Sequence, residues 1–467
     1  MRAAGRARSV RSALADFPLA PIMVLQDQCG PATRSAEVTI GPEAHRPDCL
    51  GGVIYDMSNS SAGKALAGLR VLDLSRVLAG PLGGQILGDL GASVVKVERR
   101  GSGDPSRTMG AIITRSAAGA PTQSTFHQAC NRNKLSLTVD FASAKGQELI
   151  RKLAREADIL IENYLPGTLK QYGLDYEALS AINPRLIYCS VTGYGQEGPR
   201  RSQPGFDPVF QAETGIMAVT GEADGRPLKT GIYAVDELGG YNAAIGILAA
   251  VVERERSGRG QQVDISLFDC GLAALTTVGQ TYLHTGVEPA RNGNAGVAGG
   301  PSDTFACQDG LILLMGGLGN QFTSICRILG IADVAEDPRF LTSGLRFTNR
   351  RELFDLLQAQ IGKWKREDLL AELAKASVPS GLVNTVGQAF ADKHSVARGL
   401  VVETEQAGIG TVRSIANPVR LSRTPITYDL AAPALGEGQE EVLQGWLGLG
   451  RDEIDALAAE GAIGREG

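Results

Sequence analysis

Asp236 is the side chain of this chain best suited to act as a nucleophile. It follows residues 230–235 and precedes Gly239, Gly240 and a mostly apolar segment, which places it where a helix begins. Aspartate at such a position is typical of a helix cap. The free amides and the helix dipole also favour an ionised carboxylate there, and the glycines permit close approach of a ligand or another backbone. An exposed, ionised carboxylate can attack an acyl group without a general base, so capping and nucleophilic attack are both open.

Other reactive residue types are scarce or badly spaced. The chain has four histidines and seven cysteines, with no H-E-x-x-H pattern and no C-x-x-C pair. Zinc sites, metal-dependent hydrolysis, thioredoxin-like chemistry and Ser-His-Asp chemistry are therefore disfavoured, and no metal is predicted. The scattered cysteines predict reduced thiols in a cytoplasmic protein.

Composition excludes several broad classes of protein. The chain has 467 residues, 43% of them hydrophobic and 21% charged, and a formal net charge of −5. This acidity argues against nucleic acid as the main partner. No uninterrupted apolar run is long enough to cross a membrane, and residues 237–256 are expected to form a buried helix.

The turn at residues 76–81 lies where a nucleotide-binding fold would hold its phosphates. It has one glycine followed by proline instead of G-x-G-x-x-G, so nicotinamide or flavin binding is not expected, although another nucleotide geometry stays open. Residues 96–100 (Lys-Val-Glu-Arg-Arg) place cations at the end of the next predicted strand. They are either a solvated charge run or a phosphate contact.

Strands and helices alternate around these residues. Strands are predicted at 69–74, 93–98, 158–161, 186–190 and 262–267, and helices at 81–90, 144–156, 168–181 and 237–256. Alternation of this kind predicts an α/β fold with a parallel, doubly wound sheet. A smaller α+β domain is expected after the glycine-rich break at 292–301.

Four segments are predicted from these patterns. Residues 1–65 are expected to be a disordered or mistranslated leader, with Met57 a plausible start. The other three are a large domain at 66–290, a small domain at 291–430 and a tail at 431–467; the family resemblance given below implies that the large domain is Rossmann-like and that the tail is a C-terminal return to it.

Several separated motifs together resemble the class III CoA-transferases, which include formyl-CoA transferase, carnitine CoA-transferase and α-methylacyl-CoA racemase. The likeness runs from about Leu66 to Leu447. The motifs are residues 68–73 with 79–81, 91–92 with 96–98, 131–134, 162–164 with 166–167, 183–187, 193–195 and 258–261. Any one of these is weak, but their order and spacing are specific.

The resemblance implies a role for individual residues. Asp236 matches the catalytic aspartate of the family. The positions that match CoA contacts are Leu78, Ala79, Arg99, Asn163, Tyr164, Gln203, Pro204, Gly205 and Phe206. A mobile glycine loop is matched by Gly296, Gly299 and Gly300. An interlocked homodimer is also implied.

The implied activity is transfer of CoA between an acyl-CoA, with succinyl-CoA as one expected donor, and a free carboxylic acid through an aspartyl-CoA thioester. CoA thioester would be a substrate, with no permanently bound cofactor. Racemase relatives carry a histidine where this chain has Phe206, and racemisation needs an acid and a base on opposite faces of the substrate. Gln171 replaces an arginine of formyl-CoA transferase. The alternatives are a racemase or isomerase, a non-catalytic CoA-binding protein and, last, an NAD-dependent dehydrogenase.

Overall fold

The computed structural model describes residues 63–113, 123–295 and 300–464. All but the last three residues of the expected leader lie outside these ranges, as do Gly296 and Gly299 of the predicted glycine loop.

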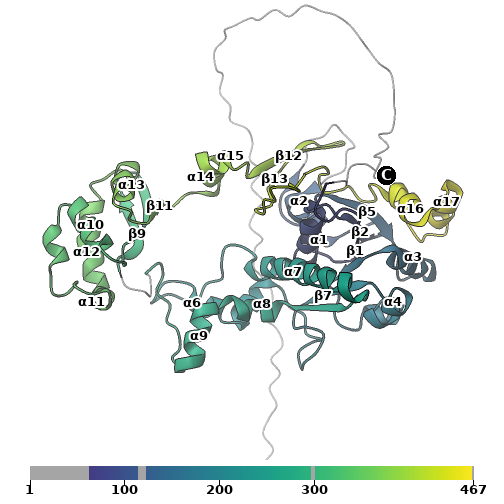
Figure 1. Cartoon of the computed structure of the whole chain (residues 1–467), viewed down its shortest axis with the longest axis horizontal. Coiled ribbons are helices and arrows are strands. Elements are labelled where there is room, and N and C mark those ends of the chain that lie inside the picture. Colours follow the sequence, from purple (N-terminus) through teal and green to yellow (C-terminus); the bar gives the residue numbers. More distant parts are fainter. Residues whose placement is uncertain (1–62, 114–122, 296–299, 465–467) are drawn as a thin grey trace, which may run out of the picture. The chain divides into compact units, whose positions relative to one another are not determined.

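A parallel six-stranded sheet forms the centre of the fold, in the order β5-β2-β1-β6-β7-β8 (Figure 1). Every neighbouring pair is parallel. The strands are β1 (Arg70–Asp73), β2 (Ser93–Arg99), β5 (Lys134–Val139), β6 (Ile159–Glu162), β7 (Ile187–Thr192) and β8 (Gln262–Ser266). This is the order of a doubly wound dinucleotide-binding sheet, which confirms the predicted α/β class.

Helices cover both faces of the sheet. Adjacent residues of β1 enter different cores, with Val71 in one and Leu72 in the other, because successive side chains of a strand point to opposite faces. The Val71 face packs against helices α1 (Ala79–Asp89) and α7 (Ala234–Ser257). The Leu72 face packs against α3 (Ala144–Glu156), α4 (Tyr176–Ile182), α16 (Gln439–Leu447) and α17 (Arg451–Ala459).

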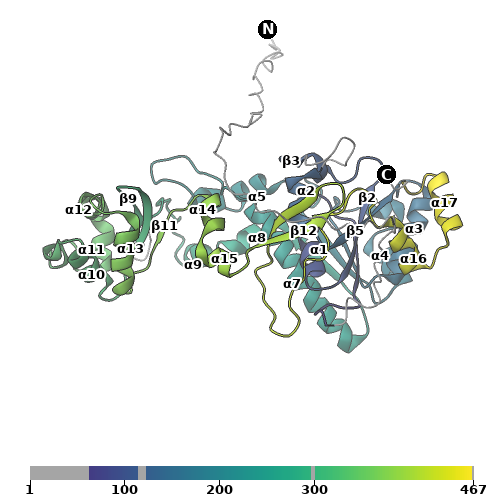
Figure 2. The same cartoon turned by 90° about the horizontal axis from the view of Figure 1, so that it is seen from above.

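Two predicted helices are interrupted by glycines. The helix predicted at 168–181 is a short 3-10 helix, η2 (Leu169–Tyr172), followed by α4, because Gly173 adopts the left-handed conformation between them. The C-terminal segment, for which a helical tail at 436–459 is predicted, likewise forms two helices, α16 and α17, with Gly448 in the left-handed conformation after α16. Figure 2 shows both tail helices beside α3.

Helix α7 is less buried than the sequence predicts. It is long and apolar enough to cross a membrane by length and composition, and 39% of its most apolar window is buried. Its inner face packs on the sheet and α1, whereas Tyr241, Ile245 and Val252 are exposed. Core packing therefore accounts for only part of its apolar character.

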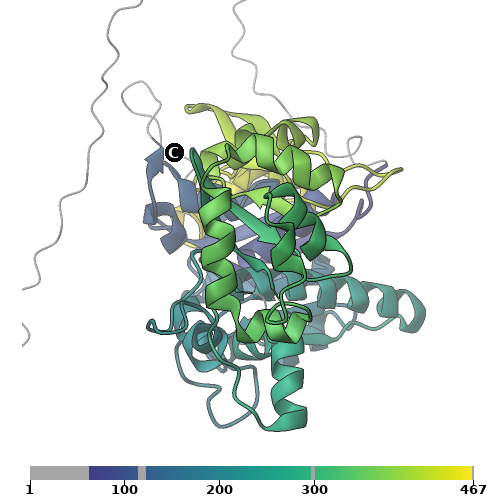
Figure 3. The same cartoon turned by 90° about the vertical axis from the view of Figure 1, so that its left-hand side faces the viewer.

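A separate hydrophobic core is built from residues between Phe305 and Val378. Its three-stranded sheet has the order β11-β10-β9, and helices gather around that sheet (Figure 3, green). The elements are β9 (Ser302–Cys307), β10 (Gly310–Met315), α10 (Gln321–Ile328), η3 (Ala332–Ala335), α11 (Ser343–Thr348), α12 (Arg350–Ile361), α13 (Arg366–Lys375) and β11 (Ser380–Leu382). The division into domains at 290 and 430 stays a prediction.

The remaining elements are short. They are η1 (Pro105–Thr108), β3 (Ile112–Ile113), β4 (Gln123–Ser124), α2 (Thr125–Cys130), α5 (Asp207–Glu213), α6 (Ile216–Val219), α8 (Leu267–Ala274), α9 (Thr276–Thr285), α14 (Val386–Ala391), α15 (Lys393–Ala397), β12 (Val401–Gln406) and β13 (Gly410–Ile415).

Candidate active site

The first turn of α7 holds Asp236, but Asp236 does not cap it. The helix starts at Ala234, and its N-cap residue is Tyr233, which offers no side-chain hydrogen bond. The cap comes instead from Asp207 at the start of α5. The Asp207 Oδ1 atom accepts hydrogen bonds from the amides of Val235 (2.8 Å) and Asp236 (3.3 Å). The expectation that Asp236 caps the helix is therefore wrong, because a carboxylate from another element already takes the free amides.

A buried glutamine fixes the position of Asp207. Gln211, one turn further along α5, is fully buried and donates from Nε2 to Asp207 Oδ2 at 2.6 Å. Its Oε1 atom accepts from the amide of Thr230 at 2.8 Å. Gln211 thus joins the capping carboxylate to the segment that leads into α7, and both aspartates depend on one network.

The carboxylate of Asp236 is left without a partner. Among the residues that the structure describes, no hydrogen bond or ion pair reaches its oxygens, and the side chain is half-buried. Burial raises its pKa to about 7, with further contributions from the negative charges of Asp207 and Glu237. The prediction of an exposed, fully ionised carboxylate is therefore wrong, because burial and the neighbouring negative charges raise the pKa of Asp236.

Gly239 and Gly240 allow α7 to pack tightly against α1 and α8. A Cβ atom on Gly240 would lie 2.8 Å from the carbonyl oxygen of Ala79, and one on Gly239 would lie 2.4 Å from the Leu267 side chain. The close approach predicted beside Asp236 is thus made by neighbouring helices. It places the first turns of α7 and α1 side by side.

The turn between β1 and α1, residues 75–77, is held entirely by side chains. Each of its six backbone N–H and C=O groups bonds to a side chain from another position. The partners are Asp73 for Ser75 N (3.0 Å), Lys96 for Ser75 O (3.0 Å), Asn163 for Arg76 N and O (2.8 and 2.7 Å), Asp104 for Val77 N (3.2 Å) and Cys130 for Val77 O (3.4 Å). The turn is therefore formed before any ligand arrives.

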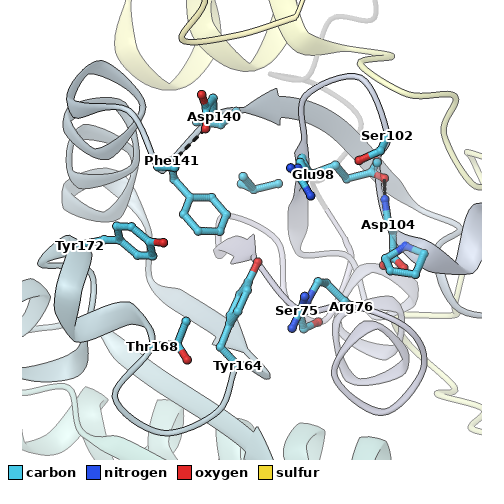
Figure 4. A pocket seen from close by; sticks show the side chains of 16 residues that line it. Ser75, Arg76, Glu98, Ser102, Asp104, Asp140, Phe141, Tyr164, Thr168 and Tyr172 are labelled. Carbon is cyan, nitrogen blue, oxygen red and sulfur yellow. Dashed lines mark hydrogen bonds between the residues drawn. The ribbon is translucent and has the colours of Figure 1, made fainter.

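A cavity of 390 Å³ opens at the carboxyl ends of the central strands (Figure 4). Ligands of doubly wound sheets bind at this edge, where the chain reverses its direction across the sheet. Residues after β1, β2, β5 and β6 line it. In the cavity, the Arg76 guanidinium lies 4.2 Å from the centre of the Tyr164 ring. The cavity thus offers a cation, aromatic side chains and the turn at 75–77 to one ligand.

The cavity brings together some of the residues predicted to contact CoA. Arg99 and Tyr164 line it, and Asn163 holds the backbone of Arg76, which also lines it. Leu78 and Ala79 follow the turn as the N-cap and first residue of α1, and both are buried.

The basic run at 96–100 is not a single cationic patch. Lys96 is fully buried and pairs with Asp104 at 2.8 Å, while the buried Glu98 pairs with Arg107 at 2.6 Å. Arg100 donates to the carbonyl of Gly461. Arg99 is the residue of this run that offers an exposed cation to the cavity.

The stretch from Gln203 to Phe206 lies apart from the cavity lining. It is mostly exposed, with Phe206 70% exposed, and it leads directly into Asp207. Gly300 is the member of the predicted glycine loop that the structure describes, and its carbonyl accepts a hydrogen bond from Arg346 at 2.6 Å. CoA contacts at Gln203, Pro204, Gly205 and Phe206 stay predictions.

Arg76, Asp104 and Asp207 were not predicted as site residues. One signal was present: Lys96 interrupts an apolar strand, and a buried lysine needs an acidic partner. Nothing local identifies Asp104 as that partner. Asp207 also has no local signal, because the amides that it caps are 28 and 29 residues further along the chain.

Comparison with known proteins gives consistent matches over this fold. The family model described as CoA-transferase family III matches residues 66–439. The chain is 39% identical to the succinate–glutarate CoA-transferase of Agrobacterium fabrum, over 81% of this chain and 94% of that protein. It is 35% identical to the succinyl-CoA–D-citramalate CoA-transferase of Chloroflexus aurantiacus, over 87% of this chain and all of that protein. The crystal structure of a CaiB/BaiF family protein from Brucella suis matches with a TM-score of 0.74 and 42% identity, over 81% of this chain and 98% of that one.

Proposed function

The chain belongs to CoA-transferase family III, and we propose that it moves CoA from succinyl-CoA to a free dicarboxylic acid. The names of two relatives support this substrate class, since one names succinate with glutarate and the other names succinyl-CoA with D-citramalate. All of these acids are short dicarboxylates or their hydroxylated forms.

One observation carries the catalytic part of the proposal. Asp236 is a half-buried carboxylate with no partner in the described part of the chain, while Asp207 supplies the cap of α7. A carboxylate without hydrogen-bond donors keeps its lone pairs available for attack. We therefore assign Asp236 as the nucleophile.

The reaction then proceeds through four acyl transfers on Asp236. Its carboxylate attacks the thioester carbonyl of the donor, the C–S bond breaks, and a mixed anhydride and CoA thiolate form. The thiolate attacks the aspartyl carbonyl, which releases the donor acid and leaves an aspartyl-CoA thioester. The acceptor carboxylate attacks this thioester to give a second anhydride and thiolate. Attack of the thiolate on the acceptor acyl carbon forms the new acyl-CoA and restores the carboxylate.

The cavity is assigned to the nucleotide part of CoA. Arg99 and Arg76 supply guanidinium groups suited to phosphates, and Tyr164 supplies a ring for an adenine or a pantetheine chain. The turn at 75–77 then leads to Leu78 and Ala79, whose helix lies against α7 near Asp236.

Phe206 gives no support to racemisation. Its exposed ring holds the position of the racemase histidine and cannot move a proton.

Trapping of the intermediate tests the proposal. The protein is mixed with succinyl-CoA or a panel of other acyl-CoAs, treated with hydroxylamine, digested and analysed by mass spectrometry. A hydroxamate on the peptide that contains Asp236, formed only with certain donors, is expected. Acyl-CoA binding without any adduct would overturn the transferase mechanism.

Two further features belong to the same proposal. We infer a homodimer, because α7 exposes the apolar side chains of Tyr241, Ile245 and Val252, and α9 exposes those of Tyr282 and Leu283. We also infer a cytoplasmic location, which fits the free state of all five cysteines in the described ranges.

A further inference from the structure

Val77 has a backbone conformation that its side chain disfavours. Its φ angle is +69°, in the left-handed region. A β-branched residue is rare there, because its Cβ atom crowds the backbone, whereas glycine adopts the region freely. Something outside the residue must therefore hold Val77 in place.

The carboxylate of Asp104 stabilises this conformation of Val77. The amide of Val77 donates to both Asp104 oxygens at 3.2 Å, and Asp104 lies on the far side of the turn, at the start of η1. In the left-handed conformation the amide of Val77 points toward the Asp104 carboxylate, so the hydrogen bonds between them favour the strained conformation.

Lys96 keeps Asp104 in position and ionised. The Lys96 ammonium lies 2.8 Å from Asp104 Oδ2, and both side chains are almost fully buried. The same ammonium donates to the carbonyl of Ser75 at 3.0 Å. Burial alone would raise the pKa of Asp104, but the Lys96 charge and hydrogen bonds from Lys96 and Ser106 together hold it below its ordinary value. The ion pair thus contacts the turn at both Ser75 and Val77.

The strained residue sets the direction of the start of α1. Leu78 is the N-cap of this helix and Ala79 is its first residue, so the backbone angles of Val77 decide where the first amides of α1 point. We propose that Lys96 and Asp104 are positioning residues for CoA: they hold Val77 in the left-handed conformation and thereby aim the turn and the start of α1 at the bound thioester. This inference rests on the proposed function.

A variant that removes the pair and a variant that removes the strain test the inference together. Lys96→Met with Asp104→Leu removes both charges at once, which avoids leaving one buried charge alone. The dissociation constant for CoA, measured by calorimetry, is expected to rise roughly 5- to 30-fold, the factor that corresponds to the cost of a left-handed non-glycine residue. In a Val77→Gly background, the same pair of changes is expected to raise it less than about 3-fold, because glycine needs no external hold.

A second buried ion pair supplies the matched control. Asp89, the last residue of α1, lies 2.6 Å from Arg132, so this pair stands at the other end of the helix. Asp89→Leu with Arg132→Met is expected to lower the melting temperature and leave CoA affinity unchanged in both backgrounds. If the Lys96/Asp104 variant does not fold, Asp104→Ala carries the same comparison, because it removes the acceptor of the Val77 amide while Asp73 and Glu98 remain to balance the Lys96 charge.

The outcomes separate this inference from the function on which it rests. Equal losses of affinity in the unaltered and the Val77→Gly backgrounds, or no loss at all, overturn the positioning role while CoA binding to the unaltered protein still stands. Failure of the unaltered protein to bind CoA overturns the proposed function and the inference together.

Discussion

Asp207 and Asp236 are two carboxylates at one helix start with different surroundings. Asp207 accepts hydrogen bonds from two amides of α7 and one from Gln211, so its lone pairs are occupied. Asp236 accepts none in the described part of the chain, and its pKa is raised to about 7. Asp207 thus caps the helix, and Asp236 is left available for the role proposed for it.

Replacing Asp236 by asparagine is expected to abolish transfer and stabilise the fold. Because burial and like charges raise the pKa of Asp236 from 3.8 to about 7, its ionisation costs stability as the pH rises through this range. Asp236→Asn should therefore raise the free energy of unfolding by about 2–4 kcal/mol at pH 8 and by little at pH 4. Urea unfolding at both pH values measures this. Glu253→Gln, on the exposed last turns of α7, is the control, and an equal gain at both pH values would contradict the prediction.

The rate of the first acyl transfer is expected to follow the ionisation of Asp236. Only the carboxylate attacks, so kcat/KM for the donor should rise with pH and level off above about 7. Asp207→Asn removes a neighbouring negative charge and keeps an oxygen that can accept from the amides, so the rise should move to lower pH by roughly half a unit or more. Glu253→Gln should leave the midpoint in place, and an unmoved midpoint in Asp207→Asn would show that this charge does not act on Asp236.

At the scale of elements, the crossing of α1 and α7 places Asp236, the proposed nucleophile. The two helices touch through backbone and small side chains, with Gly240 against Ala79 and Leu82 and Gly83 against Ala243. Any side chain added at this crossing moves the first turn of α7 relative to the turn at 75–77.

Gly240→Ala is expected to cost stability and activity together. Its new methyl group would lie 2.8 Å from the Ala79 carbonyl oxygen, so the helices must separate. Overpacking of this kind costs about 1–3 kcal/mol. Thermal unfolding and the transfer rate measure both effects. Gly445→Ala on α16 is the matched control, since its methyl group meets nothing within 4 Å, and it should stabilise by up to about 1 kcal/mol. Full activity of Gly240→Ala would show that the crossing does not position Asp236.

Strands β1, β2, β6, β7 and β8 were predicted within a few residues of their observed positions. Each carries apolar side chains, although β2 also buries Lys96 and Glu98. Strand β5 was missed although its polar and apolar residues alternate, as is typical of a strand. Its polar side chains are buried by partners on distant parts of the chain, which the sequence does not display: Lys134 pairs with Asp73, Ser136 donates to Glu98 and Thr138 donates to Gln439.

The candidate site likewise has features that the sequence displays and features that it does not. Asp236 was singled out because its residue type, the predicted helix start and the glycine pair are adjacent in the sequence, and because it matches the catalytic aspartate of the family. Its catalytic role stays a prediction. The cap by Asp207, the raised pKa and the hold on Val77 depend on contacts between distant residues, which a single sequence does not display.

At the scale of the whole molecule, the exposed side of α7 bears directly on assembly. A helix with Ile245 64% exposed and Val252 55% exposed leaves apolar surface in contact with water, which a second copy of the chain would cover.

Ile245→Lys is therefore expected to yield a monomer or to weaken the dimer strongly. A charged side chain buried without a partner in an interface opposes association. Light scattering coupled to size-exclusion chromatography measures the mass against 49.0 kDa for one chain. Ile112→Lys, an equally drastic change on the exposed strand β3, is the control and should leave the mass unchanged. A monomeric unaltered protein would remove the proposed dimer.

The turn at 75–77 has a consequence for how the protein is made and engineered. Its side-chain partners stand between 2 and 87 residues away in the sequence. The conformation of this segment is therefore determined by residues elsewhere in the chain, and the segment would not adopt it after transfer into another scaffold. In the protein itself the turn takes shape only once β1, β2, η1, α2 and the end of β6 have come together. A chain with any of these parts misplaced lacks the turn, so the turn's presence marks assembly of the part of the sheet formed by β1, β2 and β6.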